Sequence, residues 1–149
     1  MTLQNWLDNG WLHPHQTSPQ ELADLLAVAD RDLVNAQSSG LSDDWKFGIA
    51  YNAALKLCTM MLYDAGYRPV HNLAHYQTVR SIGFTMGSAF LPAAEYLNDC
   101  RKMRNTAEYE MAGCVSAAEA AELLAFTKTL RAEVLARLRP KYPELGADS

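Results

Sequence analysis

The chain has 149 residues, of which 49% are hydrophobic, and a net charge of −4. This length and composition are typical of one soluble globular domain that can bury a core. The negative charge argues against a broad electrostatic surface for nucleic acid and leaves room only for a local basic patch at Arg101, Lys102 and Arg104. No signal peptide and no membrane-spanning stretch can be recognised, so we expect a cytoplasmic protein with no membrane partner.

Helical periodicity dominates the chain from its first residues, and no strand pattern competes with it. Residues 3–9 are predicted to form a short helix or turn near the N-terminus. Trp6 and Trp11 in this region should pack onto the body of the domain or onto a second copy of it.

The first two long helices have clear sequence boundaries. A capping box with proline at the first helical position begins at Ser18, and the helix that follows runs to about Gln37. The second helix runs from Ser42 to about Ala65 and ends at Gly66. Its apolar side chains cover well over half of its circumference, so it must be covered on more than one side. We expect it to be central to the fold and to supply part of a subunit interface; a cofactor or lipid pocket between the helices is the alternative.

The second half of the chain is predicted to hold a shorter helix and two long ones. A turn at residues 66–69 precedes a third helix over residues 71–82. Two glycines and a proline between residues 83 and 92 then indicate a loop. A fourth helix covers about residues 93–107, and the last one begins at a second capping box and occupies residues 116–140.

These elements predict an all-α fold. Four principal helices with short connections favour an up-and-down four-helix bundle over residues 18–140, with an additional short helix. Residues 1–17 form an N-terminal arm in this interpretation, and residues 141–149 form a C-terminal tail.

Arg104 is the most informative residue of the chain. Counting back through Leu97 and Cys100 at helical spacing places Arg104 on the apolar side of its helix. A guanidinium group cannot shed its charge, so in that position it needs an acceptor or an anionic ligand. A purely structural explanation is an ion pair with Glu108 one turn on, or with Asp99 or an acidic residue of another helix.

A binding site around Arg104 is the functional explanation of the same residue. Asn105 beside it is a donor or a helix-end residue, and Arg101 adds a second positive charge. Lys56 lies on the polar side of the second long helix, where it is either solvated or lines a groove opposite Arg104. No glycine-rich phosphate loop and no acyl-transfer triad can be recognised, and the two cysteines on helices lack an activating pattern.

The run Arg104-Asn105-Thr106-Ala107-Glu108-Tyr109, together with Gly66-Tyr67-Arg68 and the histidine-containing third helix with His75, resembles the HEPN superfamily of small helical-bundle domains. Within it, the chain is similar to a bacterial subgroup of single-domain proteins, and the likeness covers about residues 20–135. The resemblance implies a bundle that often forms a homodimer, with both copies of the motif facing one cleft. Catalytic members are metal-independent endoribonucleases, many of them toxins or defence effectors, in which arginine holds the scissile phosphate and histidine moves a proton.

This chain departs from the catalytic pattern, because Tyr109 stands where that histidine is expected. Tyrosine titrates near pH ~10 against ~6.5 for histidine, so it is a poor general base at neutral pH. We therefore expect a binding or regulatory module that takes a nucleotide or RNA ligand at a dimer cleft, held by Arg104, Asn105, Arg101 and Lys56. The resemblance also implies a nucleotidyltransferase or antitoxin as a partner protein.

Two enzymatic alternatives remain open. In a metal-independent endoribonuclease, Arg104 would hold the phosphate and Tyr109 or His75 would move the proton. In a metal-dependent hydrolase, His71 and His75 at positions i and i+4 would bind the metal, but no further ligands are evident nearby. Neither a metal nor a cofactor is therefore expected.

Overall fold

The computed structural model describes residues 1–71 and 74–146, and within them the chain is mostly helical, as the all-α prediction requires. The long helices are α2 (Pro19–Asn35), α3 (Asp43–Asp64), α6 (Leu91–Tyr109) and α7 (Ala117–Leu138). Shorter elements are α1 (Leu3–Asp8), α4 (Ala74–Arg80), α5 (Ile82–Thr85) and the 3₁₀ turn η2 (Ser88–Phe90). No helix in the described residues is long and apolar enough to span a bilayer.

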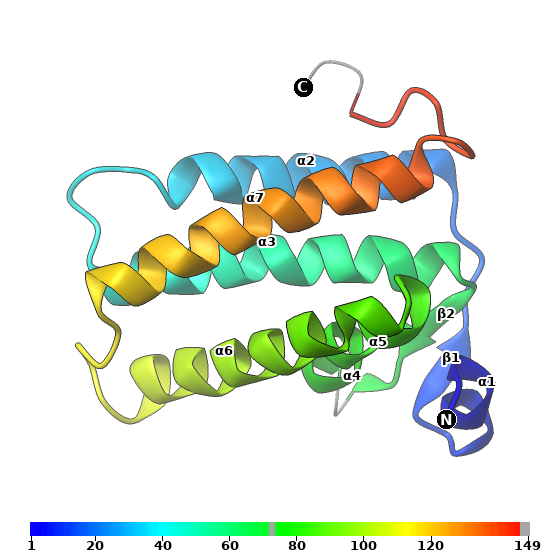
Figure 1. Cartoon of the computed structure of the whole chain (residues 1–149), viewed down its shortest axis with the longest axis horizontal. Coiled ribbons are helices and arrows are strands. Elements are labelled where there is room, and N and C mark those ends of the chain that lie inside the picture. Colours follow the sequence, from blue (N-terminus) through cyan, green and yellow to red (C-terminus); the bar gives the residue numbers. More distant parts are fainter. Residues whose placement is uncertain (72–73, 147–149) are drawn as a thin grey trace.

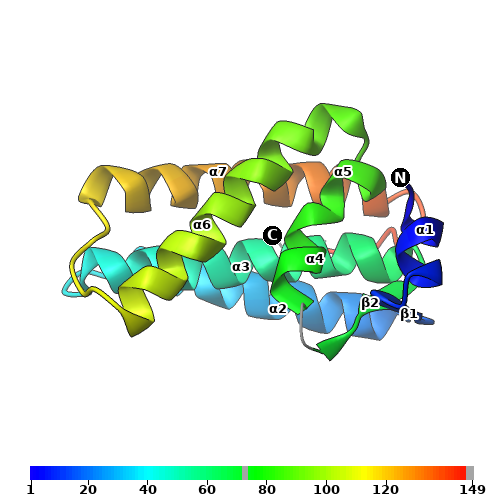
Figure 2. The same cartoon turned by 90° about the horizontal axis from the view of Figure 1, so that it is seen from below.

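The long helices run in alternating directions along the molecule (Figure 1). The central helix is α3, which packs against α2, α6 and α7. Figure 2 shows α6 crossing α3 obliquely, with α4 and α5 filling the angle beside it. These neighbours cover most of the apolar circumference of α3, but Trp45 near its start stays 66% exposed.

The core is built from apolar side chains of all four long helices. From α3 it takes Phe47, Ala50, Tyr51, Ala54, Leu57, Cys58 and Met61; from α2, Leu22, Leu26, Ala29 and Leu33; from α6, Ala94, Leu97 and Cys100; and from α7, Leu123, Leu130, Val134 and Leu138. A second, smaller cluster holds the N-terminal region, where Trp6 meets the Phe84 ring edge-on at 5.1 Å between ring centroids. Trp6 therefore packs onto the body of its own chain, whereas Trp11 is 39% exposed.

The expectation that no strand would form was wrong. Strands β1 (Leu12–Pro14) and β2 (Tyr67–Pro69) pair antiparallel, with Leu12 opposite Pro69. Each strand has three residues and contains a proline, so neither is long enough to show the alternation that reveals a strand in sequence. The pair forms because Gly66, at φ +97°, reverses the chain after α3 and its carbonyl accepts a hydrogen bond from the His15 N–H at 2.8 Å.

The predicted third helix over residues 71–82 differs in the structure. Residues 72–73 of that span lie outside the described residues, and the remainder is divided into α4 and α5 around the buried Ser81. The Ser81 hydroxyl donates to the Thr78 carbonyl at 2.6 Å, a local bond that competes with regular helix. The predicted loop is also partly helical, because α5 extends to Thr85.

The fourth helix is longer at both ends than the predicted residues 93–107. Pro92 lies within its first turn, where the missing N–H costs no helical hydrogen bond. At the other end the helix continues to Tyr109. At the C-terminus of the described chain, Leu145 is buried and the Tyr142 hydroxyl donates to Asp64 at 2.9 Å, so residues 141–146 pack against the body.

Candidate functional site

The side chains that sequence analysis singled out gather between α3, α4 and α6, over one buried tyrosine. Tyr51 of α3 is completely buried. The Arg104 guanidinium carbon lies 5.6 Å from the centroid of the Tyr51 ring, and the His75 ring centroid lies 6.2 Å from the same point. We call Tyr51, Lys56, His75, Arg101 and Arg104 the Arg104 cluster. It forms because α4 and α6 both lie across α3 (Figure 2).

Arg104 is mostly enclosed, with a side chain 18% exposed. Its Nη2 lies 3.3 Å from Oε1 of Glu108, so the ion pair one turn along the helix is present. Its Nε is buried and has no hydrogen-bond partner among the described protein groups. Because a guanidinium has five N–H donors, a single carboxylate contact leaves donors available for a second anion.

Tyr51 adds a neutral donor to the cluster. Its hydroxyl is buried and makes no hydrogen bond to a described protein group. Burial raises the pKa of Tyr51 well above its ordinary value, so the hydroxyl keeps its proton at every physiological pH. A buried hydroxyl without a protein acceptor is uncommon, and such groups recur at functional sites.

His75 is neutral at pH 7 in this environment. Partial burial of its ring lowers the pKa, and the positive charges of Arg104, Lys56 and Arg101 lower it further. The residue as a whole is still exposed at the surface, so its ring can be reached from solvent.

The basic side of the cluster is only partly neutralised. Arg101 Nε donates to Oδ1 of Asn98 at 3.0 Å, and its guanidinium carbon lies 5.5 Å from the centroid of the Tyr76 ring, which is 38% exposed. In residues 1–71 and 74–146, neither Arg101 nor Lys56 has a carboxylate within 4.0 Å. Within 4.0 Å, the described residues therefore supply these three cations with one carboxylate, that of Glu108 on Arg104, in a chain whose net charge is negative.

Other predicted site residues lie apart from the cluster. Tyr109 is 77% exposed at the end of α6 and lines a different cavity. Asn105 is half-buried, and its side chain makes no hydrogen bond to a residue that the structure describes. His71 is exposed, and no three His, Cys, Asp or Glu side chains gather into a metal site within the described part of the chain.

The cysteines offer no nucleophile in this region. Burial raises the pKa of Cys58 and of Cys100 to about 12, so both stay as thiols. Sequence analysis missed Tyr51, Tyr76 and Asn98 as parts of the site. The spacing of Tyr51 on the apolar side of α3 indicates a core position, and only its hydroxyl, among otherwise apolar neighbours, signals more than packing.

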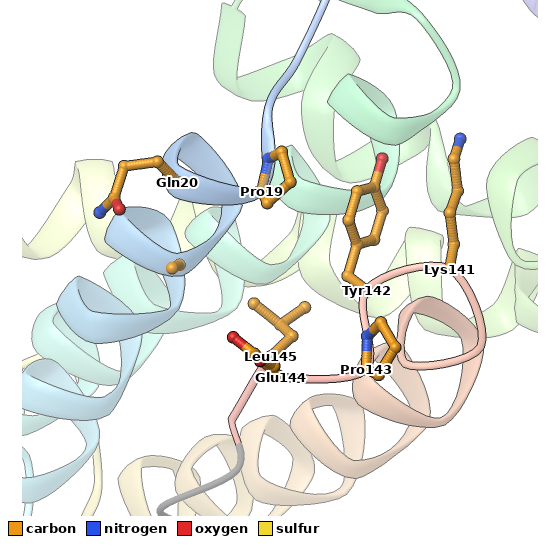
Figure 3. Close-up of a pocket in the computed structure, with 8 residues that line it drawn as sticks. Pro19, Gln20, Lys141, Tyr142, Pro143, Glu144 and Leu145 are labelled. Atoms are coloured by element: carbon orange, nitrogen blue, oxygen red, sulfur yellow. The ribbon is translucent and has the colours of Figure 1, made fainter.

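Two of the cavities in the described part of the chain border the long helices. One, of about 960 Å³, lies between the N-terminal end of α3 and the C-terminal end of α6, and Glu108 belongs to its wall. The other, of about 490 Å³, lies between the start of α2 and the C-terminal segment, where Figure 3 shows Pro19 and Gln20 near Tyr142 and Leu145. Its single cation, Lys141, already pairs with Asp64, so this second cavity lacks the convergent charges of the Arg104 cluster.

No protein-family model, no curated protein and no solved structure matches this chain. The function of the protein is therefore inferred from the chemistry of its own residues and from the motif that ends α6.

Proposed function

We propose that this protein is a HEPN-like binding or regulatory module that takes a nucleotide or RNA phosphate at the Arg104 cluster. The observation that carries the proposal is the convergence of Arg104, Arg101 and Lys56 beside neutral His75, with Glu108 as the one carboxylate within 4.0 Å of these cations among the described residues. Guanidinium groups suit phosphate because their paired N–H groups match two phosphate oxygens.

Tyr76 supports a nucleotide rather than a bare phosphate. Its ring is partly exposed and lies beside two guanidinium groups, those of Arg101 and Arg80, at 5.5 and 5.8 Å from the ring centroid. Aromatic side chains next to cations are the usual partners of a base whose phosphate is held nearby. A base on Tyr76 with its phosphate toward Arg104 fits this arrangement.

A metal-independent endoribonuclease is the second candidate, and the position of His75 favours it. A neutral imidazole near the phosphate-binding arginine is able to accept a proton from a ribose hydroxyl. In this version Arg104 holds the scissile phosphate and His75 replaces the missing motif histidine as the base. The homodimer with two motifs at one cleft, and a nucleotidyltransferase or antitoxin partner, stay predictions of the resemblance.

Calorimetric titration with ATP and with a short single-stranded RNA tests the proposal. Arg104→Ala should weaken binding by about 10- to 100-fold, because a hydrogen bond to a charged group is worth about 1.5–3 kcal/mol. Arg131→Ala is the matched control, since Arg131 also pairs with a carboxylate, Asp30, but joins α7 to α2 away from the cluster. Wild-type affinity in Arg104→Ala would exclude the site.

The ribonuclease version needs a separate assay. Labelled RNA is incubated with the protein in chelator, and cleavage that disappears in Arg104→Ala and His75→Gln supports catalysis at this cluster. Binding without cleavage leaves the protein a binding module. Cleavage that persists in both variants assigns the activity to another site or to a contaminant.

A further inference from the structure

The 960 Å³ cavity beside the Arg104 cluster is a candidate interaction surface with its own chemistry. We call it the α3–α6 groove; it is lined by Ser42, Asp43, Asp44, Trp45, Gly48, Ile49, Asn52, Ala107, Glu108, Tyr109, Ala112, Gly113 and Val115. Three carboxylates belong to this lining and no lysine, arginine or histidine does. Its charge is therefore opposite to that of the neighbouring cluster.

Two large aromatic side chains are left exposed in the same groove. Trp45 is 66% exposed and Tyr109 is 77% exposed, while Ile49 lines the groove between the helices. Met111, at the start of the connection to α7, is 59% exposed. Gathered exposed apolar side chains of this size mark contact sites for other molecules.

Hydrogen bonds fix one wall of the groove. The Asp44 carboxylate accepts hydrogen bonds from the Gly113 N–H at 2.6 Å and from the Val115 N–H at 3.3 Å, which ties the α6–α7 connection to the start of α3. The Asp44 oxygens are thus already occupied. Asp43 can meet an incoming cation directly, and Glu108, which already pairs with Arg104 at 3.3 Å, has a side chain that is 39% exposed and can be shared with a second cation.

We propose that the α3–α6 groove docks a basic amphipathic helical segment of a partner protein, with lysine or arginine side chains on one face and leucine-like residues on the other. Cationic groups are attracted both by the carboxylates and by the faces of exposed tryptophan and tyrosine rings. An acidic segment would be repelled by Asp43 and Glu108, and a purely apolar one would bury these charges without partners. A purely polar one would leave Trp45 and Tyr109 in water.

A fluorescein-labelled peptide of about 14 residues, with lysines and leucines at helical spacing, is the probe for this surface. Fluorescence anisotropy measures its binding to the full chain. Two comparison peptides carry glutamate in place of every lysine, or serine in place of every leucine. The lysine–leucine peptide should bind saturably to one site, and both comparison peptides should bind about tenfold more weakly or not at all.

Matched variants separate the groove from the rest of the surface. Trp45→Ala and Asp43→Asn should each weaken the lysine–leucine peptide about tenfold. Val34→Ala removes an apolar side chain that is 69% exposed on α2, and Asp24→Asn removes an exposed carboxylate of the same helix, so neither should change binding. Circular dichroism melting confirms that each variant is folded.

Three results would overturn the proposal. Wild-type affinity in the groove variants would place the peptide elsewhere. A comparison peptide that binds as tightly as the lysine–leucine peptide would show that the groove does not require both positive charges and apolar side chains in its ligand. Sedimentation that shows a dimer of the free protein, dissociated by Trp45→Ala, would assign the groove to a second copy of this chain. None of these results bears on Arg104→Ala in the nucleotide titration, so the two proposals fail independently.

Discussion

Replacing Glu108 by glutamine is expected to tighten anion binding at Arg104 while slightly destabilising the free protein. The substitution keeps the size of the side chain and removes its charge. The ion pair it breaks has a 3.3 Å separation and joins side chains that are 18% and 39% exposed, one turn apart on α6. Such pairs contribute about 0.3–0.5 kcal/mol to helix stability, so the melting temperature should fall by about 1–2 °C.

In free energy, the expected gain in ATP affinity is larger than this loss of stability, because the Glu108 carboxylate repels the phosphate that Arg104 binds. A phosphate on Arg104 would lie roughly 5 Å from the Glu108 carboxylate, and two unit charges at that distance repel by about 1–3 kcal/mol at effective dielectric constants of about 20–60. Salt at physiological concentration screens part of this repulsion. We therefore expect ATP to bind Glu108→Gln about tenfold more tightly than wild type.

Calorimetric titration with ATP and urea denaturation measure the two effects on the same samples. Glu133→Gln is the matched control: Glu133 pairs with Arg137 at the same helical spacing on α7, with a 2.6 Å separation, and lies outside the Arg104 cluster. This control should lose similar stability and keep wild-type affinity. If Glu108→Gln binds ATP no better than wild type, Glu108 does not compete with the ligand and the anion does not contact Arg104.

Two further substitutions test the interior of the cluster. Tyr51→Phe removes a buried hydroxyl that has no acceptor among the residues that the structure describes, so the free energy of unfolding should stay level or rise by about 1–2 kcal/mol, and a clear fall in urea denaturation would show that the hydroxyl has a partner. His75 has a lowered pKa in the folded state, so the unfolded chain binds the proton first. Wild-type stability should therefore fall as the pH drops through the ordinary histidine value of 6.5 towards the folded value, and His75→Gln should lose this part of the pH dependence. ATP should bind more tightly over the same pH range, because an anion favours the protonated ring; affinity that does not change with pH would place the ligand away from His75.

Helix starts were predictable because their signals are local. Ser18, Ser42 and Ser116 each accept a hydrogen bond from the backbone N–H three residues on, at 3.1, 3.2 and 3.0 Å. Each serine acts within its own first turn, so no distant contact is needed to recognise it. The starts of α2, α3 and α7 follow directly from these three positions.

Features that depend on distant contacts could not be predicted in the same way. The β1–β2 pair joins Leu12–Pro14 to Tyr67–Pro69, segments separated by two long helices. The role of Gly83 also depends on tertiary packing. In the sequence this glycine indicates a loop, but in the structure it lies inside α5, where a Cβ atom would come within 2.6 Å of the Leu91 side chain. Glycine at this position therefore permits the close packing of α5 against α6.

In the candidate site, too, the features set by local spacing were predictable and those set by helix packing were not. The apolar position of Arg104 follows from helical spacing, and its ion pair with Glu108 follows from the four-residue separation. The approach of His75, Lys56 and Arg101 to one point depends on how α4 and α6 cross α3, which no local pattern specifies. The role of Tyr51 could not be recognised from the sequence for a further reason. A ring in the core and a ring that lies beneath a binding site occupy the same helical spacing of apolar residues.

Glu108 links the two proposed surfaces, because one carboxylate both pairs with Arg104 and lines the α3–α6 groove. A lysine or arginine of a bound segment that contacts Glu108 would draw it away from Arg104 and lower the competition that a phosphate meets there. By thermodynamic linkage, a phosphate that displaces Glu108 would strengthen the binding of the basic segment by the same factor. The coupling cannot exceed the repulsion that Glu108 exerts on the anion, about 1–3 kcal/mol, and it should vanish in Glu108→Gln. An acidic residue four positions after the phosphate-binding arginine would thus connect nucleotide occupancy to partner binding without any movement of the helices.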